Sequence, residues 1–310
     1  MKKAIITGPT GTIGMALINE LVNNGVEVVA VVRPNSTRSS RIVENSKIKK
    51  VECDLSELDK LPEILEKENI SDIDTFYHFA WDGTFGNSRN NMYGQNENVK
   101  YSLDAVKAAS RIKCKTFIGS GSQAEYGRFE GKLNALTPTF PENGYGIAKL
   151  CAGQMTRIMC EEFGIKHIWT RILSIYGPYD GDKTMIMSLI SSLLQGQKPS
   201  CTLGEQKWDY LYSKDAAKAF RLLGEKGKHG KIYTIGSGSV RPLKDYIVGM
   251  KNQINPKAEI GFGDIPYGNK QVMYLCADTT ELVNDTGFEP GYSFEEGINE
   301  TIDWIKNGRR

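Results

Sequence analysis

Short apolar runs alternate with longer amphipathic segments through the first half of the chain. Apolar runs rich in β-branched residues are typical of strands that a parallel sheet buries on both faces, and apolar residues at helical spacing indicate helices that cover such a sheet. This alternation predicts an α/β fold with helices on both faces of a parallel sheet. The predicted strands are 4–7, 26–32, 48–53, 75–80, 115–119 and 167–172, and the predicted helices are 13–24, 58–67, 98–109 and 145–163.

The alternation becomes less regular after about residue 174, where the spacing predicts helices at 185–194, 213–223 and 294–304 and a strand at 231–235. Neither a repeat nor a long linker divides the chain into independent domains. We therefore expect a doubly wound Rossmann sheet over residues 1–173, with a return at 213–236, and a smaller C-terminal α/β lobe over 174–310. The cleft between them is the expected binding site.

One predicted helix, 145–163, carries an apolar stripe that admits two interpretations. The stripe belongs either to the core or to a contact with a second copy of the chain. An apolar helix face is core by default, and we adopt that interpretation here. The residues of the stripe are Ile147, Leu150, Met155 and Ile158.

Composition narrows the class of protein. The chain has 310 residues, of which 40% are hydrophobic and 25% are charged, as in soluble globular proteins. A chain of this length buries a large core without disulfides or metals. The 39 basic and 37 acidic residues give a net charge of +2, which argues against a dedicated nucleic-acid-binding protein.

The six cysteines include no C-x-x-C pair and no cluster with histidine at zinc-site spacing. We therefore expect thiols in a reducing compartment and no metal. The apolar run at the N-terminus is too short for a signal peptide, and no stretch approaches the roughly 20 apolar residues of a membrane span. These features predict a cytoplasmic protein with no membrane contact.

A glycine-rich turn, Thr7–Gly14, follows the first predicted strand and opens the first helix. Its sequence is T-G-P-T-G-T-I-G, with the spacing G-x-x-G-x-x-G. Glycines allow a tight turn and let a pyrophosphate approach the helix N-terminus, where free N–H groups favour an anion. The strand–turn–helix context predicts a dinucleotide-binding site.

The segment after the second strand indicates which dinucleotide binds. An acidic residue there would bind the ribose 2′-hydroxyl of NAD, but the chain has Arg33, Ser36 and Arg38 instead. A guanidinium binds a 2′-phosphate through its planar fork, so we expect NADP, with NAD as the alternative. Asp54, after the third strand, either accepts a hydrogen bond from the adenine or caps the following helix.

A Tyr-x-x-x-Lys motif, Tyr145 and Lys149, lies on a predicted helix. Residues four apart share a helix face, and an ammonium near a phenol stabilises the phenolate. A serine-rich strand end, Gly119–Gly127, precedes the motif. A serine there is able to bind a substrate oxygen that gains and loses a proton, so the two segments together predict acid/base chemistry.

Together these segments resemble the extended short-chain dehydrogenase/reductases, and more narrowly the nucleotide-sugar epimerase/dehydratase family. The glycine-rich turn, the serine element and the Tyr-x-x-x-Lys motif occur in that family's order. Three further segments extend the resemblance almost to the end of the chain. Tyr77–Ala80 resembles the H-x-A segment, Arg171–Pro178 resembles R-x-x-N-x-Y-G-P, and Trp208–Ala217 resembles R-D-F-x-x-V-x-D-x-A.

The resemblance implies a role for each residue of the motif. Tyr145 exchanges a proton with the sugar hydroxyl, Lys149 lowers the pKa of that tyrosine and holds the nicotinamide ribose, and Ser122 orients the reacting oxygen. A homodimer is expected by analogy. The remaining expected cofactor contacts are Gly8, Thr10, Gly11, Thr12, Ile13, Gly14, Leu55, Phe79 and Ala80, and the expected substrate contacts are Trp81, Asp82, Gln123, Trp208 and Lys270.

Departures from the family pattern bear on the reaction. Dehydratases of the family have an Asp-Glu pair where this chain has Gln123 and Ala124, so loss of water is not expected. The asparagine of R-x-x-N is Ser174, and the arginine expected to bind the substrate diphosphate is Trp208. The diphosphate would then be held by other groups.

The expected function is NADPH-dependent reduction of a 4-keto nucleoside-diphosphate sugar. The alternative is a nucleotide-sugar C4 epimerase that retains NAD and uses the same Ser122, Tyr145 and Lys149. A more remote alternative is a non-catalytic sensor that binds NADP and a partner protein. Because both Tyr145 and Lys149 are present, the enzyme is favoured over the sensor.

Overall fold

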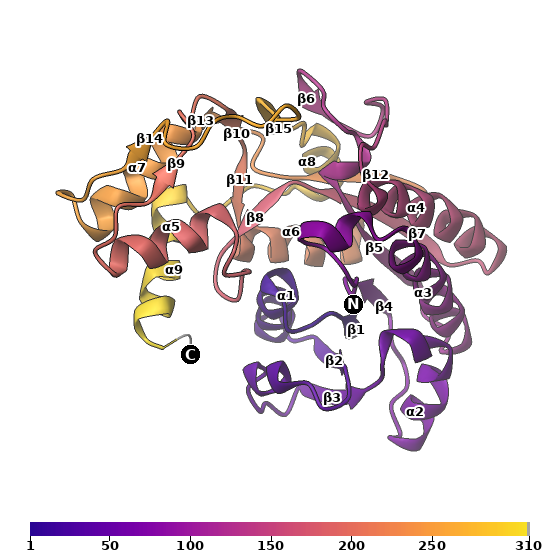
Figure 1. The fold of residues 1–310 in the computed structure, drawn as a ribbon. Helices are drawn as coiled ribbons and strands as arrows, with labels where there is room; N and C mark the ends of the chain where they lie inside the picture. The colour runs from indigo at the N-terminus through magenta and orange to yellow at the C-terminus, as the bar shows by residue number, and fades with distance from the viewer. Residues whose placement is uncertain (309–310) are drawn as a thin grey trace.

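Seven parallel strands form the central sheet, in the order β12-β7-β5-β4-β1-β2-β3 (Figure 1). The computed structural model describes residues 1–308. Each of the predicted strands lies in this sheet, so the predicted Rossmann architecture is confirmed. The strands are β1 (Lys3–Thr7), β2 (Glu27–Val32), β3 (Ile48–Glu52), β4 (Thr75–His78), β5 (Thr116–Ser122), β7 (Lys166–Ile172) and β12 (Ile232–Ile235).

The strand order reverses between β1 and β4. From β1 the chain builds outward through β2 and β3, and it then crosses back to place β4 on the other side of β1. Thr7 at the end of β1 is in register with His78 at the end of β4. In open α/β sheets ligands bind in the crevice outside such a reversal, so the fold puts a site at this edge.

Helices cover both faces of the sheet (Figure 1). Ile6 points to one apolar core and its neighbour Ile5 points to the other, because successive side chains of a strand alternate between faces. The first face packs against α1 (Thr12–Asn23) and α6 (Ser213–Lys226), and the second packs against α2 (Leu61–Lys67), α3 (Met92–Arg111) and α4 (Gly144–Glu162).

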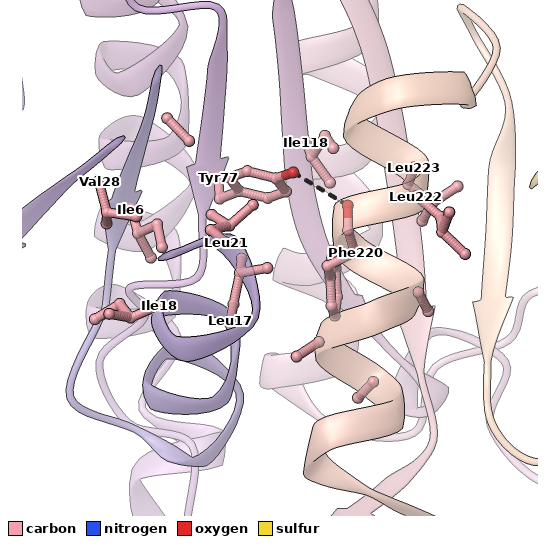
Figure 2. Close-up of a cluster of buried hydrophobic side chains, with 14 of the residues drawn as sticks. Ile6, Leu17, Ile18, Leu21, Val28, Tyr77, Ile118, Phe220, Leu222 and Leu223 are labelled. Atoms are coloured by element: carbon pink, nitrogen blue, oxygen red, sulfur yellow. Dashed lines mark hydrogen bonds between the residues drawn. The ribbon is translucent and has the colours of Figure 1, made fainter. Parts of the chain in front are cut away.

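A buried tyrosine joins the first core to a helix from much later in the chain. Figure 2 shows the ring of Tyr77 among apolar side chains, with its hydroxyl directed at α6. That hydroxyl donates to the carbonyl oxygen of Phe220 at 3.1 Å. A side chain at Gly224 would meet the same hydroxyl. The glycine therefore lets α6 approach the sheet closely enough for this buried hydroxyl to find its partner.

The C-terminal part, together with β6 (Lys132–Leu133) from the first half of the chain, forms small sheets and further helices. One of its apolar clusters includes Tyr176, Tyr212 and Ile298, and a separate cluster includes Leu133 and Leu275. One four-stranded sheet has the order β13 (Arg241–Pro242), β10 (Lys207–Trp208), β15 (Tyr274–Ala277) and β6. There are also two two-stranded sheets. One pairs β8 (Ser174–Tyr176) with β11 (Tyr210–Tyr212), and the other pairs β9 (Ser200–Cys201) with β14 (Gly261–Phe262). The helices are α5 (Met185–Leu194), α7 (Leu243–Ile254), α8 (Thr280–Thr286) and α9 (Phe294–Lys306).

The default interpretation of the apolar stripe on α4 is wrong. Ile147 and Ile158 are 52% and 49% exposed and Met155 is 43% exposed, whereas Leu150 is partly buried. The helix instead buries a face of small residues, because Gly153 lies so close to Trp169 that a side chain there would clash with the indole. Because small residues occupy the face of α4 that packs against the sheet, the larger apolar side chains of the helix lie on its exposed face.

Candidate functional site

A cleft of about 950 Å³ opens at the C-terminal ends of the central strands. The glycine-rich turn forms one part of it, and the end of β5 and the start of α4 form another. The structure thus brings together residues that are far apart in the sequence. All of the predicted cofactor contacts line this cleft: Gly8, Thr10, Gly11, Thr12, Ile13, Gly14, Arg33, Ser36, Arg38, Asp54, Leu55, Phe79, Ala80 and Lys149.

The three glycines of the turn have different surroundings. Gly8 has a φ of +69°, which residues with a side chain rarely adopt, and a Cβ there would also be too close to the backbone of Ala80. A Cβ at Gly14 would lie 2.4 Å from the carbonyl oxygen of Gly8. A Cβ at Gly11 would lie 3.9 Å from its nearest neighbour, the carbonyl oxygen of Gly8. This spacing leaves room for a ligand against the backbone.

The N-terminus of α1 faces this space as an anion-binding element. Among the described residues no side chain caps the helix at Gly11. The first N–H groups of a helix have no intrahelical partner, and the helix dipole adds positive potential there. The turn therefore presents the donors that a pyrophosphate needs.

The basic segment after β2 exposes two guanidinium groups that are able to bind an anion. Arg33 and Arg38 are exposed, and within residues 1–308 no carboxylate lies within 4.0 Å of either guanidinium. Asp54 is the N-cap of the 3₁₀ turn η2 (Leu55–Lys60), where hydrogen bonds from Ser56 lower the pKa of its carboxyl. The capping role weighed for Asp54 is thus observed, and its side chain also borders the cleft.

The predicted acid/base residues meet on the opposite side of the cleft. Ser122 ends β5, and its hydroxyl accepts a hydrogen bond from the N–H of Ala124 at 3.1 Å. Tyr145 lies in the first turn of α4, which Asn143 caps by accepting from the N–H of Gly146. Lys149 lies one turn later, and its ammonium donates to the carbonyl oxygen of Ser120 at 2.6 Å.

Burial sets the protonation of this pair. The side chain of Lys149 is 2% exposed, and burial lowers its pKa to about 7. Burial raises the pKa of Tyr145, while a hydrogen bond with Ser122 and the charge of Arg89 act in the opposite direction. Burial therefore moves the titration of Lys149 toward neutrality and favours the neutral phenol at Tyr145.

Glu125 lies behind this group rather than in the cleft. Its carboxylate is fully buried and accepts from the N–H of Ser122 at 2.8 Å. It also pairs with Arg171 at 2.9 Å and accepts from the indole of Trp169 at 3.1 Å. These bonds occupy the carboxylate and hold the end of β5 in place.

The predicted substrate contacts divide into two groups. Trp81 and Asp82 line the cleft, whereas Gln123, Trp208 and Lys270 lie outside its lining. The amide oxygen of Gln123 is buried and has no partner among the described residues. Trp208 is on β10 in the C-terminal part, and Lys270 is exposed between β14 and β15.

The structure adds residues to the cleft that sequence patterns did not single out. Arg41 donates to the carbonyl oxygen of Thr10 at 2.9 Å. Tyr179 and Asp180 follow the segment that ends at Pro178, so their position in the sequence was the available signal. Burial raises the pKa of Asp180 to about 6. The added lining residues include Arg41, Thr84, Phe85, Tyr101, Tyr179, Asp180 and Trp304.

Neither a metal-binding cluster nor a membrane-spanning helix is found among residues 1–308. Within residues 1–308, no group of three or more His, Cys, Asp or Glu side chains is arranged to hold a metal ion. The helices of this described part include none with the length and apolarity to cross a membrane.

Comparisons with known proteins agree with the fold and with the family that the chain resembles. A model of the NAD dependent epimerase/dehydratase family matches residues 4–236. The chain is 28% identical to a dTDP-4-dehydro-6-deoxyglucose reductase of Escherichia coli, over 97% of each protein. It is also 28% identical to a trifunctional UDP-glucose 4,6-dehydratase, 3,5-epimerase and UDP-4-keto-L-rhamnose reductase of Arabidopsis thaliana. That match covers 98% of the chain but 47% of the plant protein, so the chain spans about half of that relative's length.

Solved structures share the fold at lower sequence identity. A UDP-glucuronic acid 4-epimerase from Bacillus cereus, in complex with NAD, superimposes with a TM-score of 0.84. It is 21% identical, and the match covers 99% of the chain and 100% of the epimerase.

Proposed function

The chain belongs to the NAD dependent epimerase/dehydratase family, and we propose that it is an NADPH-dependent reductase of a 4-keto nucleoside-diphosphate sugar. The observation that carries the proposal is one cleft that holds Ser122, Tyr145 and Lys149 opposite a glycine-rich turn. Arg33 and Arg38 on the same cleft, which have no carboxylate partner among residues 1–308, favour a phosphorylated cofactor.

The cleft fits an NADP-type dinucleotide in two respects. The open backbone at Gly11 and the uncapped start of α1 suit a pyrophosphate. The exposed guanidinium groups of Arg33 and Arg38 suit a 2′-phosphate, because two cations on an exposed segment pair with an added dianion. In this proposal residues 1–173 with the return at 213–236 bind the cofactor, and residues 174–310 form the substrate-binding lobe, which supplies Trp208 and Lys270.

The protein residues would handle the proton and the geometry of the reduction. The bound dihydronicotinamide supplies a hydride. Ser122 donates a hydrogen bond to the keto oxygen and orients it, and Tyr145 gives its phenolic proton to that oxygen as the carbon is reduced. Lys149 places positive charge beside the phenolate that remains and holds the ribose hydroxyls. One carbonyl becomes one alcohol, the cofactor is oxidised, and one proton is taken up.

The residues after Ser122 argue against dehydration. Gln123 and Ala124 carry no acid or base, and Glu125 is held behind the cleft by Arg171 and Trp169. Loss of water from a keto sugar needs both a general acid and a general base. The proposed reaction accordingly ends at hydride and proton transfer.

Two parts of the chain are proposed to hold the substrate. Trp81 and Asp82 would contact the sugar from the loop after β4, since both line the cleft. The buried amide oxygen of Gln123, which has no partner within the described part of the chain, suits the acceptance of a hydrogen bond from a sugar hydroxyl. Trp208 and Lys270 are proposed for the nucleotide portion, where an indole stacks on a base and an ammonium binds a phosphate.

A C4 epimerase that retains NAD is the second candidate. It needs the same three residues, and the name of the Bacillus cereus neighbour describes such an epimerase with NAD. In this case Tyr145 would first accept the proton of the sugar hydroxyl and later return it. The two candidates differ in whether the cofactor leaves after each turnover.

The first test is to identify by absorbance and mass spectrometry what the purified protein carries, and then to titrate it with NADH and NADPH. A protein that carries no nucleotide and binds NADPH well ahead of NADH supports the reductase. Stoichiometric retained NAD contradicts it and favours the epimerase.

Consumption of NADPH with a 4-keto sugar nucleotide then measures the reaction itself. Tyr145→Phe is expected to lower kcat by about 100- to 10,000-fold, the usual contribution of a general acid. Tyr93→Phe, at a tyrosine that is 88% exposed, is the matched control. An unchanged biological activity of Tyr145→Phe would favour the non-catalytic sensor instead.

We also propose a homodimer through α4. The exposed apolar side chains Ile147, Met155 and Ile158 form a stripe on this helix, and an exposed apolar patch marks an interaction surface. Sedimentation of the purified protein tests this. A dimer that Ile158→Glu converts to a monomer supports the proposal, and a monomeric wild-type protein contradicts it.

A further inference from the structure

An arginine from outside the predicted motifs lies directly over the ring of Tyr145. Arg89 belongs to the 3₁₀ turn η3 (Gly86–Asn90), between β4 and α3. The central carbon of its guanidinium is 4.5 Å from the centroid of the Tyr145 ring. This distance is within the range in which a cation over an aromatic face is attracted to the ring.

The turn that carries Arg89 is attached to the start of α4. The side-chain oxygen of Asn90 accepts a hydrogen bond from the N–H of Gly144 at 3.0 Å. A Cβ at Gly144 would lie 3.0 Å from the carbonyl oxygen of Arg89 and 2.6 Å from the sulfur of Met92. The absence of a side chain at Gly144, next to Tyr145, is therefore what allows η3 to pack here.

Arg89 is nearer to the tyrosine ring than the lysine of the motif is. The ammonium of Lys149 is 5.8 Å from the centroid of the Tyr145 ring, and it lies 3.7 Å over the ring of Trp81. Trp81 stands edge-on to Tyr145 at 6.1 Å, with an angle of 87° between the rings. Tyr145 thus has Arg89 over its ring at the shorter distance, and the ammonium of Lys149 lies closer to Trp81 than to Tyr145.

Arg89 and Lys149 also differ in the pH range over which they stay protonated. Burial lowers the pKa of Lys149 to about 7, so near neutral pH its charge is present only part of the time. A guanidinium keeps its proton throughout this range. Among residues 1–308 no carboxylate forms an ion pair with Arg89, and its hydrogen bond to the carbonyl oxygen of Thr84 is long, at 3.4 Å.

Four charged or titratable groups surround the phenol from different elements. Arg89 approaches from η3 and Lys149 from α4, and both favour the phenolate. Glu125, from η4 (Gln123–Glu125), acts against it, although Arg171 of β7 neutralises much of that carboxylate's charge. Removal of Arg89 would leave the phenolate with a partly neutral lysine and a buried carboxylate.

We propose that Arg89 is a positioning residue that supplies the permanent positive charge stabilising the phenolate of Tyr145. The inference rests on the proposed function, which makes Tyr145 the acid/base residue. Arg89 acts through Tyr145 and needs no contact with the substrate. It makes the loop after β4 part of the catalytic arrangement, in addition to the motif on α4.

Acetylation of tyrosines by N-acetylimidazole tests the charge effect without any substrate, because the phenolate is the reactive form. Tyr145 modification is measured by peptide mass spectrometry at pH 8 relative to Tyr93, which is 88% exposed. Arg89→Gln is expected to lower the ratio of Tyr145 to Tyr93 modification by about tenfold. An opposite charge at this range moves a pKa by about one unit or more.

The direction of the change in the modification ratio distinguishes an effect of the Arg89 charge from a purely structural role of its side chain. Loss of a merely structural arginine would uncover the ring and raise the modification of Tyr145, so an unchanged or higher ratio in Arg89→Gln overturns the proposal. Arg89→Lys keeps a cation and is expected to restore the ratio to within about twofold, on the same physical ground. Asn87→Gln, in the same turn, is the matched control and should behave as the wild type.

Turnover provides the second readout. If the wild type reduces a 4-keto sugar nucleotide, Arg89→Gln should lower kcat with little change in KM and shift the alkaline limb of the pH profile upward. A wild type that shows no turnover contradicts the proposed function, whereas the acetylation result still decides the role of Arg89. A wild type that turns over and an Arg89→Gln variant with an unchanged pH profile contradict the inference alone.

Discussion

The indole N–H of Trp208 donates a hydrogen bond to the hydroxyl of Ser174 at 2.8 Å. The two residues lie on different strands, β10 and β8, and they are the two positions where the chain departs from the arginine and asparagine of the resembled family pattern. The two departures are therefore in direct contact, and the serine hydroxyl is the acceptor for the indole N–H.

The pair predicts energetic coupling between these residues. Ser174→Ala leaves the indole N–H unpaired, and Trp208→Phe leaves the hydroxyl unpaired. The double variant should therefore lose less free energy of unfolding than the two single variants combined, with a coupling of about 1 kcal/mol. Urea unfolding of the four proteins measures it. The control pair, Trp208→Phe with the distant Ser110→Ala, should be additive, and additivity in the test pair would contradict the prediction.

The surroundings of the glycine-rich turn predict different effects for two similar substitutions. Gly14→Ala should destabilise the fold by about 1–3 kcal/mol, because its Cβ would lie 2.4 Å from the carbonyl oxygen of Gly8. Gly11→Ala, with its nearest atom 3.9 Å away, should leave stability unchanged and weaken cofactor binding. Thermal unfolding and cofactor titration measure the two effects. Equal loss of stability in both variants would argue against a ligand space at Gly11.

The basic segment after β2 predicts the cofactor preference. Arg33→Gln combined with Arg38→Gln should weaken NADPH binding by about 100-fold or more, since each of the two charged hydrogen bonds contributes about 1.5–3 kcal/mol. NADH binding should change by less than about twofold, because NADH has no 2′-phosphate for these cations to bind. Fluorescence titration compares the two cofactors. A parallel loss for both would show that the arginines do not recognise the 2′-phosphate.

Burial of Lys149 predicts a pH-dependent stability. Its pKa is about 7 in the fold, whereas a lysine in the unfolded chain titrates near about 10.4. Between these values the unfolded chain binds more protons, so stability rises with pH through the window and the penalty is complete at pH 7 and below. Lys149→Met removes that penalty, so its gain in melting temperature over the wild type should be largest at pH 7 and shrink toward pH 10.

Thermal unfolding across that pH range measures the difference. The exposed Lys47→Met is the control and should show no such trend. A gain for Lys149→Met that is the same at pH 7 and pH 10 would indicate that the lysine is charged throughout in the fold.

The strands of the central sheet were predictable because their signal is local. A parallel strand buried on both faces needs a continuous apolar run, and that run is read directly from neighbouring residues. Helices α7 and α8 were not predicted, since they lie among prolines, glycines and asparagines. The burial of Tyr246 and Met250 on α7 also depends on contacts with α5 and α9. For α4 the helix itself was predictable, but the side of it that faces the core was not.

The fold class, the glycine-rich turn and the spacing of Tyr145 and Lys149 follow from the sequence alone, because each of these is set by residues close together in the chain. The surroundings of the phenol depend on how the chain packs. Arg89 and Trp81 reach Tyr145 because the loop after β4 packs on the start of α4. Such a contact depends on how distant segments pack in three dimensions, and no periodicity along the chain encodes it.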